Sequence, residues 1–243
     1  MKTVFTWICP DWIRVKNHCR TTVNKNPSNT EPSEEFKKRL LISEHSPIRT
    51  IRVAWSWAQI KSWVATHWSR HKFEKYISTQ RDDRTNSAIS RDNLPQGALV
   101  NFDGDANMQS LIDVWRKRLC YQASPETRAL AEDFKVALHE RYPELADVLV
   151  PNCVYRCGCP EFNSCEWFNN YFIKTVEEYG LVTWGENSCP NELFNLFDIQ
   201  ERYKYYNETF YATHKYREED AHADSGVHVL SDARCDRGER EGR

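Results

Sequence analysis

Three consecutive donors, Arg70, His71 and Lys72, are the residues best suited to hold a ligand. A guanidinium can bind a phosphate through two parallel hydrogen bonds, whereas an ammonium approaches it as a point charge. With the imidazole between them, these side chains could face a diphosphate or an electron-rich ring system, as a dinucleotide offers. The alternative is that Arg70 and Lys72 end a solvated helix and that His71 packs in the core.

The elements that precede these donors must position them. Apolar residues alternate with small or polar ones from Ile51 to Ala58, which predicts a strand with one buried face. The period then changes, and apolar residues at helical spacing predict a helix from Ile60 to about Phe73. His67 and His71 share its inner face and could chelate a metal ion. Trp68, however, stands where the H-E-x-x-H motif has its glutamate.

The rest of the chain reads as helices separated by polar loops. Predicted helices cover Phe36–Ile42, 106–120, 125–138, a short stretch from Pro143, and 191–213, and predicted loops cover 24–35, 82–103 and the cysteine-rich turns of 151–165. Residues 217–243 are charged and poor in apolar side chains, which predicts disorder. We therefore expect one domain over residues 1–216 and a polar tail over 217–243.

Composition limits the class of protein. The 243 residues carry a formal net charge of −2, so no global positive field would attract nucleic acid, and no stable nucleic-acid partner is expected. Aromatic residues make up 13% of the chain, which predicts a packed core and not a disordered chain. The sequence contains neither an export signal nor a run of about 20 apolar residues, so we expect no membrane span and a cytoplasmic location.

Nine cysteines are an odd number in a chain without an export signal, which predicts reduced thiols. Cys153, Cys157, Cys159 and Cys165 could bind zinc. Structural zinc sites favour well-separated C-x2-4-C pairs, and this C-x3-C-x-C-x5-C spacing departs from that pattern. Small buried residues in tight turns are the favoured interpretation, and we predict no metal ion.

The donor triplet and its flanks resemble the flavin-dependent thymidylate synthase family. His67-Trp68-Ser69-Arg70-His71-Lys72 is similar to that family's Gln-Trp-x-Arg-His-Arg segment, which also lies on a helix after a buried strand. Upstream, residues 43–48 resemble its His-x-Ser-Pro-Phe segment and residues 19–21 its Ala-Arg-Val-Ser segment. Downstream, residues 144–151 resemble Glu-x-Ala-Arg-x-x-Leu-Pro. The four matches occur in the family's order and cover about residues 12–156.

This resemblance implies an α/β (α+β) fold, a central sheet with packed helices, assembled as a homotetramer with FAD between subunits. It implies reductive methylation of dUMP to dTMP, with methylenetetrahydrofolate giving the carbon and NADPH recharging the flavin. The resemblance also implies roles for the site residues. The flavin would be bound by Ser46, Arg70, His71 and Lys72. The nucleotide would be bound by His67, Arg70, Gln80 and Arg81, and Arg81 is the catalytic candidate. No cysteine nucleophile is required.

The chain departs from the family's pattern in the part that binds the nucleotide. Ungapped, Gln80 stands where the family has a serine; with one residue deleted, Thr79-Gln80-Arg81 matches Ser-x-Arg. Asp147 replaces an arginine, and the final arginine-rich segment has no counterpart after Pro151. Arginines in predicted loops could substitute: Arg81, Arg84, Arg91 and Arg156.

Two alternatives follow from these departures. A carboxylate at Asp147 could accept a hydrogen bond from a cytosine amino group, which suggests a related C5 modification, such as hydroxymethylation, of dUMP or dCMP. From a different class, the chain could be a non-catalytic scaffold that binds a nucleotide or a metal ion.

Overall fold

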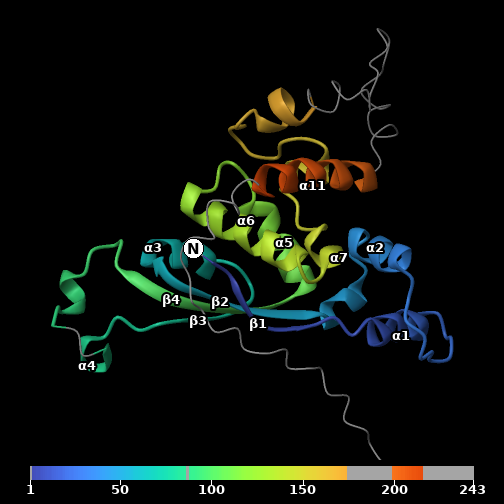
Figure 1. The fold of residues 1–243 in the computed structure, drawn as a ribbon, viewed down its shortest axis with the longest axis horizontal. Coiled ribbons are helices and arrows are strands. Elements are labelled where there is room, and N and C mark those ends of the chain that lie inside the picture. Colours follow the sequence, from blue (N-terminus) through green and yellow to red (C-terminus); the bar gives the residue numbers. More distant parts are fainter. Residues whose placement is uncertain (1, 86–87, 174–198, 216–243) are drawn as a thin grey trace, which may run out of the picture.

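A four-stranded antiparallel sheet organises the protein, seen here in a computed structural model that describes residues 2–85, 88–173 and 199–215 (Figure 1). Its strands lie in the order β1-β2-β4-β3. They are β1 Val4–Cys9, β2 Arg52–Lys61, β3 Glu74–Ile77 and β4 Leu99–Asn107. The two long strands β2 and β4 form the centre, and the shorter β1 and β3 form the edges.

The described part of the chain contains nine α-helices. They are α1 Trp12–Thr22, α2 Glu34–Ile42, α3 Ser62–Ser69, α4 Asp82–Thr85, α5 Met108–Arg118, α6 Pro125–His139, α7 Pro143–Ala146, α8 Asn152–Arg156 and α11 Ile199–Lys215. Short 3-10 turns occur at η1 Ser46–Thr50 and η2 Arg91–Asn93, and a π-helical turn at η3 Phe168–Ile173. Figure 1 shows α5 and α6 above the sheet, with α11 as a further layer above them.

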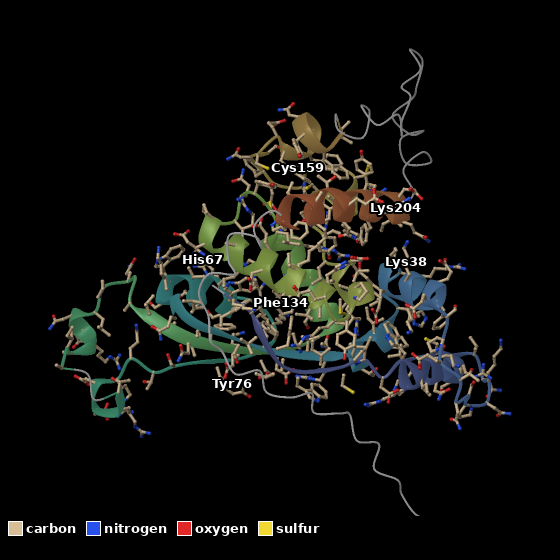
Figure 2. The ribbon with its side chains drawn as sticks, in the orientation of Figure 1. Lys38, His67, Tyr76, Phe134, Cys159 and Lys204 are labelled. Carbon is tan, nitrogen blue, oxygen red and sulfur yellow. The ribbon has the colours of Figure 1, made fainter. Side chains whose placement is uncertain are left out.

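The core lies between the sheet and α5–α6. Trp55 of β2 packs edge-on against Trp115 of α5 and Phe134 of α6, with ring centroids 5.9 and 5.2 Å apart. Trp115 and Phe134 are themselves 4.2 Å apart, and Figure 2 places Phe134 in the middle of the helical layer. All three rings are fully buried. Buried aromatic surface of this size is the main source of stability in such a core.

Trp55 fits because its cross-strand partner is a glycine. Gly104 of β4 pairs with Trp55 of β2, and a Cβ at Gly104 would lie 2.3 Å from Cζ2 of that indole. The glycine is needed here for close approach of ring and backbone, as glycines inside strands often are. The Trp55–Gly104 pair therefore fixes the register of the two central strands.

The opposite face of the sheet remains uncovered by the described parts of the chain and mixes polar with exposed apolar side chains, such as Val4. It carries Ser56, Asp103 and Asp105, with Arg52 bridging to Asp105 at 2.9 Å. Tyr76 of β3 lies on this side and is 67% exposed (Figure 2). Helices on one face and water on the other are the usual arrangement of an antiparallel sheet in an α+β fold.

Several elements confirm the predictions from the sequence. The strand predicted from Ile51 is β2, the helix of Phe36–Ile42 is most of α2, and the helix after Ser124 is α6. Pro143 begins α7 as expected. The predicted helix 191–213 is confirmed from Ile199 onward, while its first part lies outside the described residues. The tail over 217–243 also lies outside them, so the division into domain and tail stays a prediction.

Three boundary predictions are wrong. The turns predicted over 151–165 begin with the helix α8. The other two errors concern strands. The loop predicted over 82–103 ends early, because β4 begins at Leu99 and pairs with β2. The helix predicted from Ile60 to Phe73 is shorter, because Ile60 pairs with Val100 in the sheet and the chain turns at Arg70 to enter β3. In both cases strand pairing determined the boundary, against the local pattern.

The expectation of reduced thiols is wrong for one residue. Cys9, at the end of β1, is disulfide-bonded. Six other cysteines are free thiols: Cys19, Cys120, Cys153, Cys157, Cys159 and Cys165. Over the same described ranges, no helix is long and apolar enough to cross a membrane.

A buried lysine attaches α11 to the rest of the fold. Lys135 of α6 has no exposed surface and donates to the Ala146 carbonyl and to Oδ1 of Asn207 in α11, both at 2.7 Å. The rings of Tyr206, Phe210 and Tyr211 surround its ammonium, with centroids 5.6, 5.3 and 5.0 Å from Nζ. Burial lowers the pKa of Lys135 to about 7, although Asp147 raises it in part.

Replacing Gly104 by alanine tests the register of the central strands. We expect Gly104→Ala to lower the free energy of unfolding by about 1–3 kcal/mol, because the new methyl group meets the buried Trp55 indole and overpacks the core. Urea unfolding monitored by tryptophan fluorescence measures this. Gly97→Ala is the matched control, since nothing lies within 4 Å of its new methyl group. Equal stabilities of the two variants would contradict the proposed close contact.

Lys135 predicts a pH dependence of stability. Its pKa of about 7 in the folded protein lies below its ordinary value, so the unfolded chain binds more protons from about pH 7 to pH 10. The contribution of Lys135 to the free energy of unfolding should therefore rise with pH across this window. In Lys135→Met that rise should disappear, although the variant is less stable throughout because the Ala146 carbonyl and Asn207 lose their donor. Urea unfolding of both proteins at several pH values compares the slopes, and identical slopes would disprove the assignment.

Candidate functional site

The helix α3 begins at the end of β2, packs back over the sheet and positions the donor triplet shortly before β3. Its inner face is anchored by Trp68, which is fully buried and lies 4.8 Å from Trp57 and 5.2 Å from Trp115 by ring centroids. Its first residue, Ser62, donates its backbone N–H to the Ala98 carbonyl and so attaches the helix to the segment before β4. The end of α3 is consequently held in place when the chain turns at Arg70.

Arg118, at the end of α5, connects the two histidines of the signature. Its Nε donates to Nε2 of His71 at 2.8 Å, and its second guanidinium arm donates to the backbone carbonyl of His67 at 2.6 Å. Sequence reasoning missed this residue, which lies 47 positions after His71. The only signal was that Arg118 ends a run of three basic residues, 116–118, in the last turn of a helix.

The hydrogen bond from Arg118 determines the protonation of His71. A guanidinium only donates, so Nε2 of His71 must offer a lone pair, and the ring is neutral with its proton on Nδ1. Burial, together with the charges of Arg118 and Lys75, lowers the pKa of His71 to about 4. Lys75 is close because its ammonium donates to the His71 carbonyl at 2.6 Å. His71 is therefore a hydrogen-bond donor without charge at neutral pH, and it is no metal ligand in this arrangement.

His67 belongs to a second, hydroxyl-lined part of the site. Its Nδ1 lies 3.1 Å from Oγ1 of Thr127 in α6, and the hydroxyl of Ser124 donates to that same oxygen at 2.8 Å. Burial lowers the pKa of His67, and the charges of Arg118 and Arg70 also lower it, while Glu126 acts in the opposite direction. The other edge of the ring remains available because His67 is half-exposed (Figure 2).

Positive charge gathers around the end of α3 without neutralisation. Arg70 and Lys72 are exposed, and neither side chain forms a hydrogen bond or ion pair within the described residues. Arg70 is near enough to Arg118 for its charge, after the effect of burial, to lower the pKa of Arg118. The carboxylate that faces this region, Glu126, is already paired with Lys61 at 3.3 Å. Such a surface fits an anionic group such as a phosphate.

Ser46 is exposed in η1, directly before β2, whereas Arg70 follows α3, the helix after β2. The helix α3 runs back over the sheet, because Phe73 packs on Trp55 and Glu74 pairs with Asp105, opposite Ala54 of β2. Among the described residues, no hydrogen bond or ion pair joins Ser46 to the donor triplet, so the role of Ser46 stays a prediction.

Gln80 and Arg81 follow β3 and lead into α4. Arg81 is exposed and bound to Asp83 by two hydrogen bonds of 2.9 and 2.6 Å. Figure 1 shows α4 on an arm beyond the sheet, apart from α3. The structure therefore groups His67, Arg70, His71 and Lys72 but not Gln80 and Arg81, whose roles stay predictions.

Asp147 also lies apart from this group. It accepts from Nδ1 of His139 at 3.2 Å and from the Tyr211 hydroxyl at 3.3 Å, where α6 meets α11. His139 follows Thr127, the partner of His67, by 12 residues of α6, or about 18 Å of helix. Asp147 is thus engaged in helix packing, and the structure does not favour its use for a cytosine amino group beside His67.

The cysteines converge more than the spacing suggested. Cys120, Cys153, Cys159 and Cys165 line one small cavity of about 10 Å³ above α5 and α8, and Figure 2 labels Cys159 there. Cys120 was not part of the predicted cluster. In the arrangement that the structure describes, no three His, Cys, Asp or Glu side chains are grouped to hold a metal ion. The assignment of these thiols as packing residues stays a prediction.

Comparisons with known proteins support the fold. No protein-family model and no curated protein matches the sequence. Two solved structures of flavin-dependent thymidylate synthase ThyX from Helicobacter pylori, both complexed with FAD and dUMP, match with TM-scores of 0.51. One is 14% identical and matches 60% of this chain and 97% of its own, and the other is 13% identical with 61% and 99%. The chain shares their fold, which confirms the predicted central sheet with packed helices.

Thiol reactivity tests the cysteine cavity. Cys165 is exposed, whereas Cys153 is buried and burial raises its pKa to about 12. Because the thiolate is the reactive form, a short treatment with iodoacetamide should label Cys165 first and Cys153 only after unfolding. Mass spectrometry of peptides from native and urea-treated protein measures this order. A slow reaction of Cys165 in the native protein would contradict it and would support the zinc alternative.

Proposed function

We propose that this chain is a flavin-dependent enzyme that reductively methylates C5 of dUMP to give dTMP. The observation that carries the proposal is the group of unpaired donors at the end of α3, in a fold shared with enzymes solved with FAD and dUMP. Arg70 and Lys72 have no acidic partner in the described chain, and His71 offers a neutral ring N–H. This combination fits a ligand with both phosphates and a flat ring.

In this proposal Ser46, Arg70, His71 and Lys72 hold FAD. Arg70 and Lys72 bind the phosphates, because both are exposed and charged, whereas His71 donates Nδ1–H toward the ring system. When bound and reduced by NADPH, FAD would supply the hydride, and methylenetetrahydrofolate would supply the carbon. The contribution of the protein is to position these groups and to stabilise negative charge as it develops on the pyrimidine.

The nucleotide is assigned to His67, Arg70, Gln80 and Arg81. His67 has one ring edge free, and its Nδ1 is already held by Thr127. Arg81 is the catalytic candidate, which requires that a nucleotide phosphate replace Asp83 as its partner. The Arg81 and Asp83 side chains are both exposed, so replacing their ion pair by a contact with a phosphate costs little free energy.

A homotetramer with FAD between subunits is a further part of the proposal. In such an assembly a flavin could contact Ser46 of one chain and the donor triplet of another. Further parts of the proposal are the cytoplasmic location, the absence of a membrane partner and the absence of a stable nucleic-acid partner. The formal net charge of −2 supports the last of these.

Flavin binding tests the central claim. Purified protein should be yellow or gain flavin absorbance when FAD is added, and Arg70→Ala with His71→Ala should abolish it. Each lost charge-assisted hydrogen bond is worth roughly 1.5–3 kcal/mol, so the combined loss should exceed a hundredfold in affinity. Lys38→Ala is the control, because Lys38 is an exposed cation on α2, away from His67 (Figure 2). A colourless wild-type protein that cannot be loaded would refute the proposal.

The same preparation tests the reaction. Anaerobic reduction by NADPH should bleach the flavin, and its colour should return only when methylenetetrahydrofolate and dUMP are added together. The mass of the product from dUMP or dCMP then identifies the pyrimidine and the group transferred. Return of the colour without dUMP would contradict the proposed reaction. Hydroxymethylation of either nucleotide, which consumes no hydride, would favour the alternative reaction.

A further inference from the structure

Arg118 is a half-buried cation beside the site to which the proposed function gives no role. It lies on α5, outside every segment that resembles the family's motifs, yet it touches both histidines of the signature. We propose that Arg118 is a positioning residue of the flavin site, which keeps His71 as a neutral Nδ1–H donor and fixes the turn of residues 70–72. This inference rests on the proposed function.

The position of Arg118 is set by packing and not by solvent. The preceding turn of α5 carries Trp115, which is fully buried and donates Nε1–H to the Ala131 carbonyl at 3.0 Å. The Arg118 guanidinium lies 5.9 Å from the centre of the Trp68 ring. A planar guanidinium held by such packing can donate hydrogen bonds to two acceptors at a fixed separation. The acceptors here are a ring nitrogen and a backbone carbonyl of the same helix end.

The groups that face His71 all favour its neutral form. Arg118 faces it from α5 and Lys75 from β3, and both are cations. Arg70 lies on the same segment as His71, and its charge faces Arg118. The carboxylate of Glu126 in α6 raises the pKa of His67 but is not among the groups that shift the pKa of His71. A proton on Nε2 would place its N–H against the Nε–H of Arg118, so protonation requires that this hydrogen bond break. The positive charge of the site then comes from the arginines and lysines, and His71 contributes a directed donor.

A chemical consequence follows for the cofactor. A neutral imidazole can lie against a flat uncharged ring without the cost of desolvating a cation, whereas an imidazolium cannot. Affinity for FAD should therefore be nearly constant from pH 8 down to about pH 5 in the wild-type protein. Without Arg118, His71 should accept a proton within that range and affinity should become dependent on pH.

The test combines the titration of His71 with flavin binding. Histidine ring signals in NMR spectra, assigned by their loss in His71→Gln, should show Nδ1 protonated and Nε2 unprotonated at pH 7 in flavin-free wild-type protein, with no titration above pH 5. In Arg118→Gln the pKa of His71 should rise by about one unit or more, because a neighbouring cation has been removed. Arg118→Lys should give a smaller rise, since its charge stays but its fork is lost.

Lys117→Ala is the matched control. It is the adjacent position on α5, is exposed and pairs with Glu161, so it removes one cation of the same helix end without touching His71. Neither the His71 pKa nor the affinity for FAD should change in this variant. In Arg118→Gln, affinity for FAD should fall about tenfold at pH 7 and vary between pH 5 and pH 7.

The outcomes separate the two proposals. If wild-type His71 is protonated or carries its proton on Nε2 at pH 7, the role of Arg118 is overturned whatever the variants do. If Arg118→Gln leaves the His71 pKa and the pH profile of FAD binding unchanged, it is overturned as well. If His71 behaves as expected but no variant and no wild-type protein binds FAD, the proposed function fails, and with it the role of Arg118 at a flavin site.

Discussion

The contact of the Trp55 indole with the backbone of Gly104 is the constraint on which the arrangement depends. It allows a very large side chain to lie between two adjacent strands and the helices above them. Trp55 contacts Trp57, Phe73, Trp115 and Phe134, so a single ring joins β2 to the start of β3, to α5 and to α6. The contact has a cost, because the indole N–H groups of Trp55 and Trp68 find no acceptor among the described residues.

This aromatic core also sets the geometry of the candidate site. Trp115 lies against Trp68, which holds α3 beside α5. One turn further along α5, Arg118 reaches the carbonyl of His67 and the ring of His71. The polar contacts at the helix end thus follow from apolar packing below them. A site built on two packed helices holds its donors more rigidly than a site built on loops alone.

Much of the fold could be predicted from local patterns, because its central elements are amphipathic. Alternation over Ile51–Ala58 predicted β2, and capping and helical spacing predicted α6. Three strands were not predicted. The edge strands β1 and β3 bury little surface on either side and show no clear alternation. The central strand β4 lies mostly within the segment predicted as a loop, where polar residues and Gly104 interrupt the apolar pattern. The donor triplet was found because its residues are adjacent in sequence. Arg118 was not, because only the tertiary fold brings it to His71, and no local pattern encodes that distance.

The attachment of α11 has a consequence for the order in which the chain folds. Lys135 lies in α6, but its side-chain acceptor, Asn207, and the three rings around it arrive 71 to 76 positions later. Until α11 is made, the ammonium has only the Ala146 carbonyl as a protein partner and remains hydrated. During synthesis, the sheet and α5–α6 can therefore pack first, and the ammonium loses its water only when the last described helix closes over it. The Lys135 ammonium is thus shielded from water only after α11 has formed and packed on α6, so this is a late step in folding.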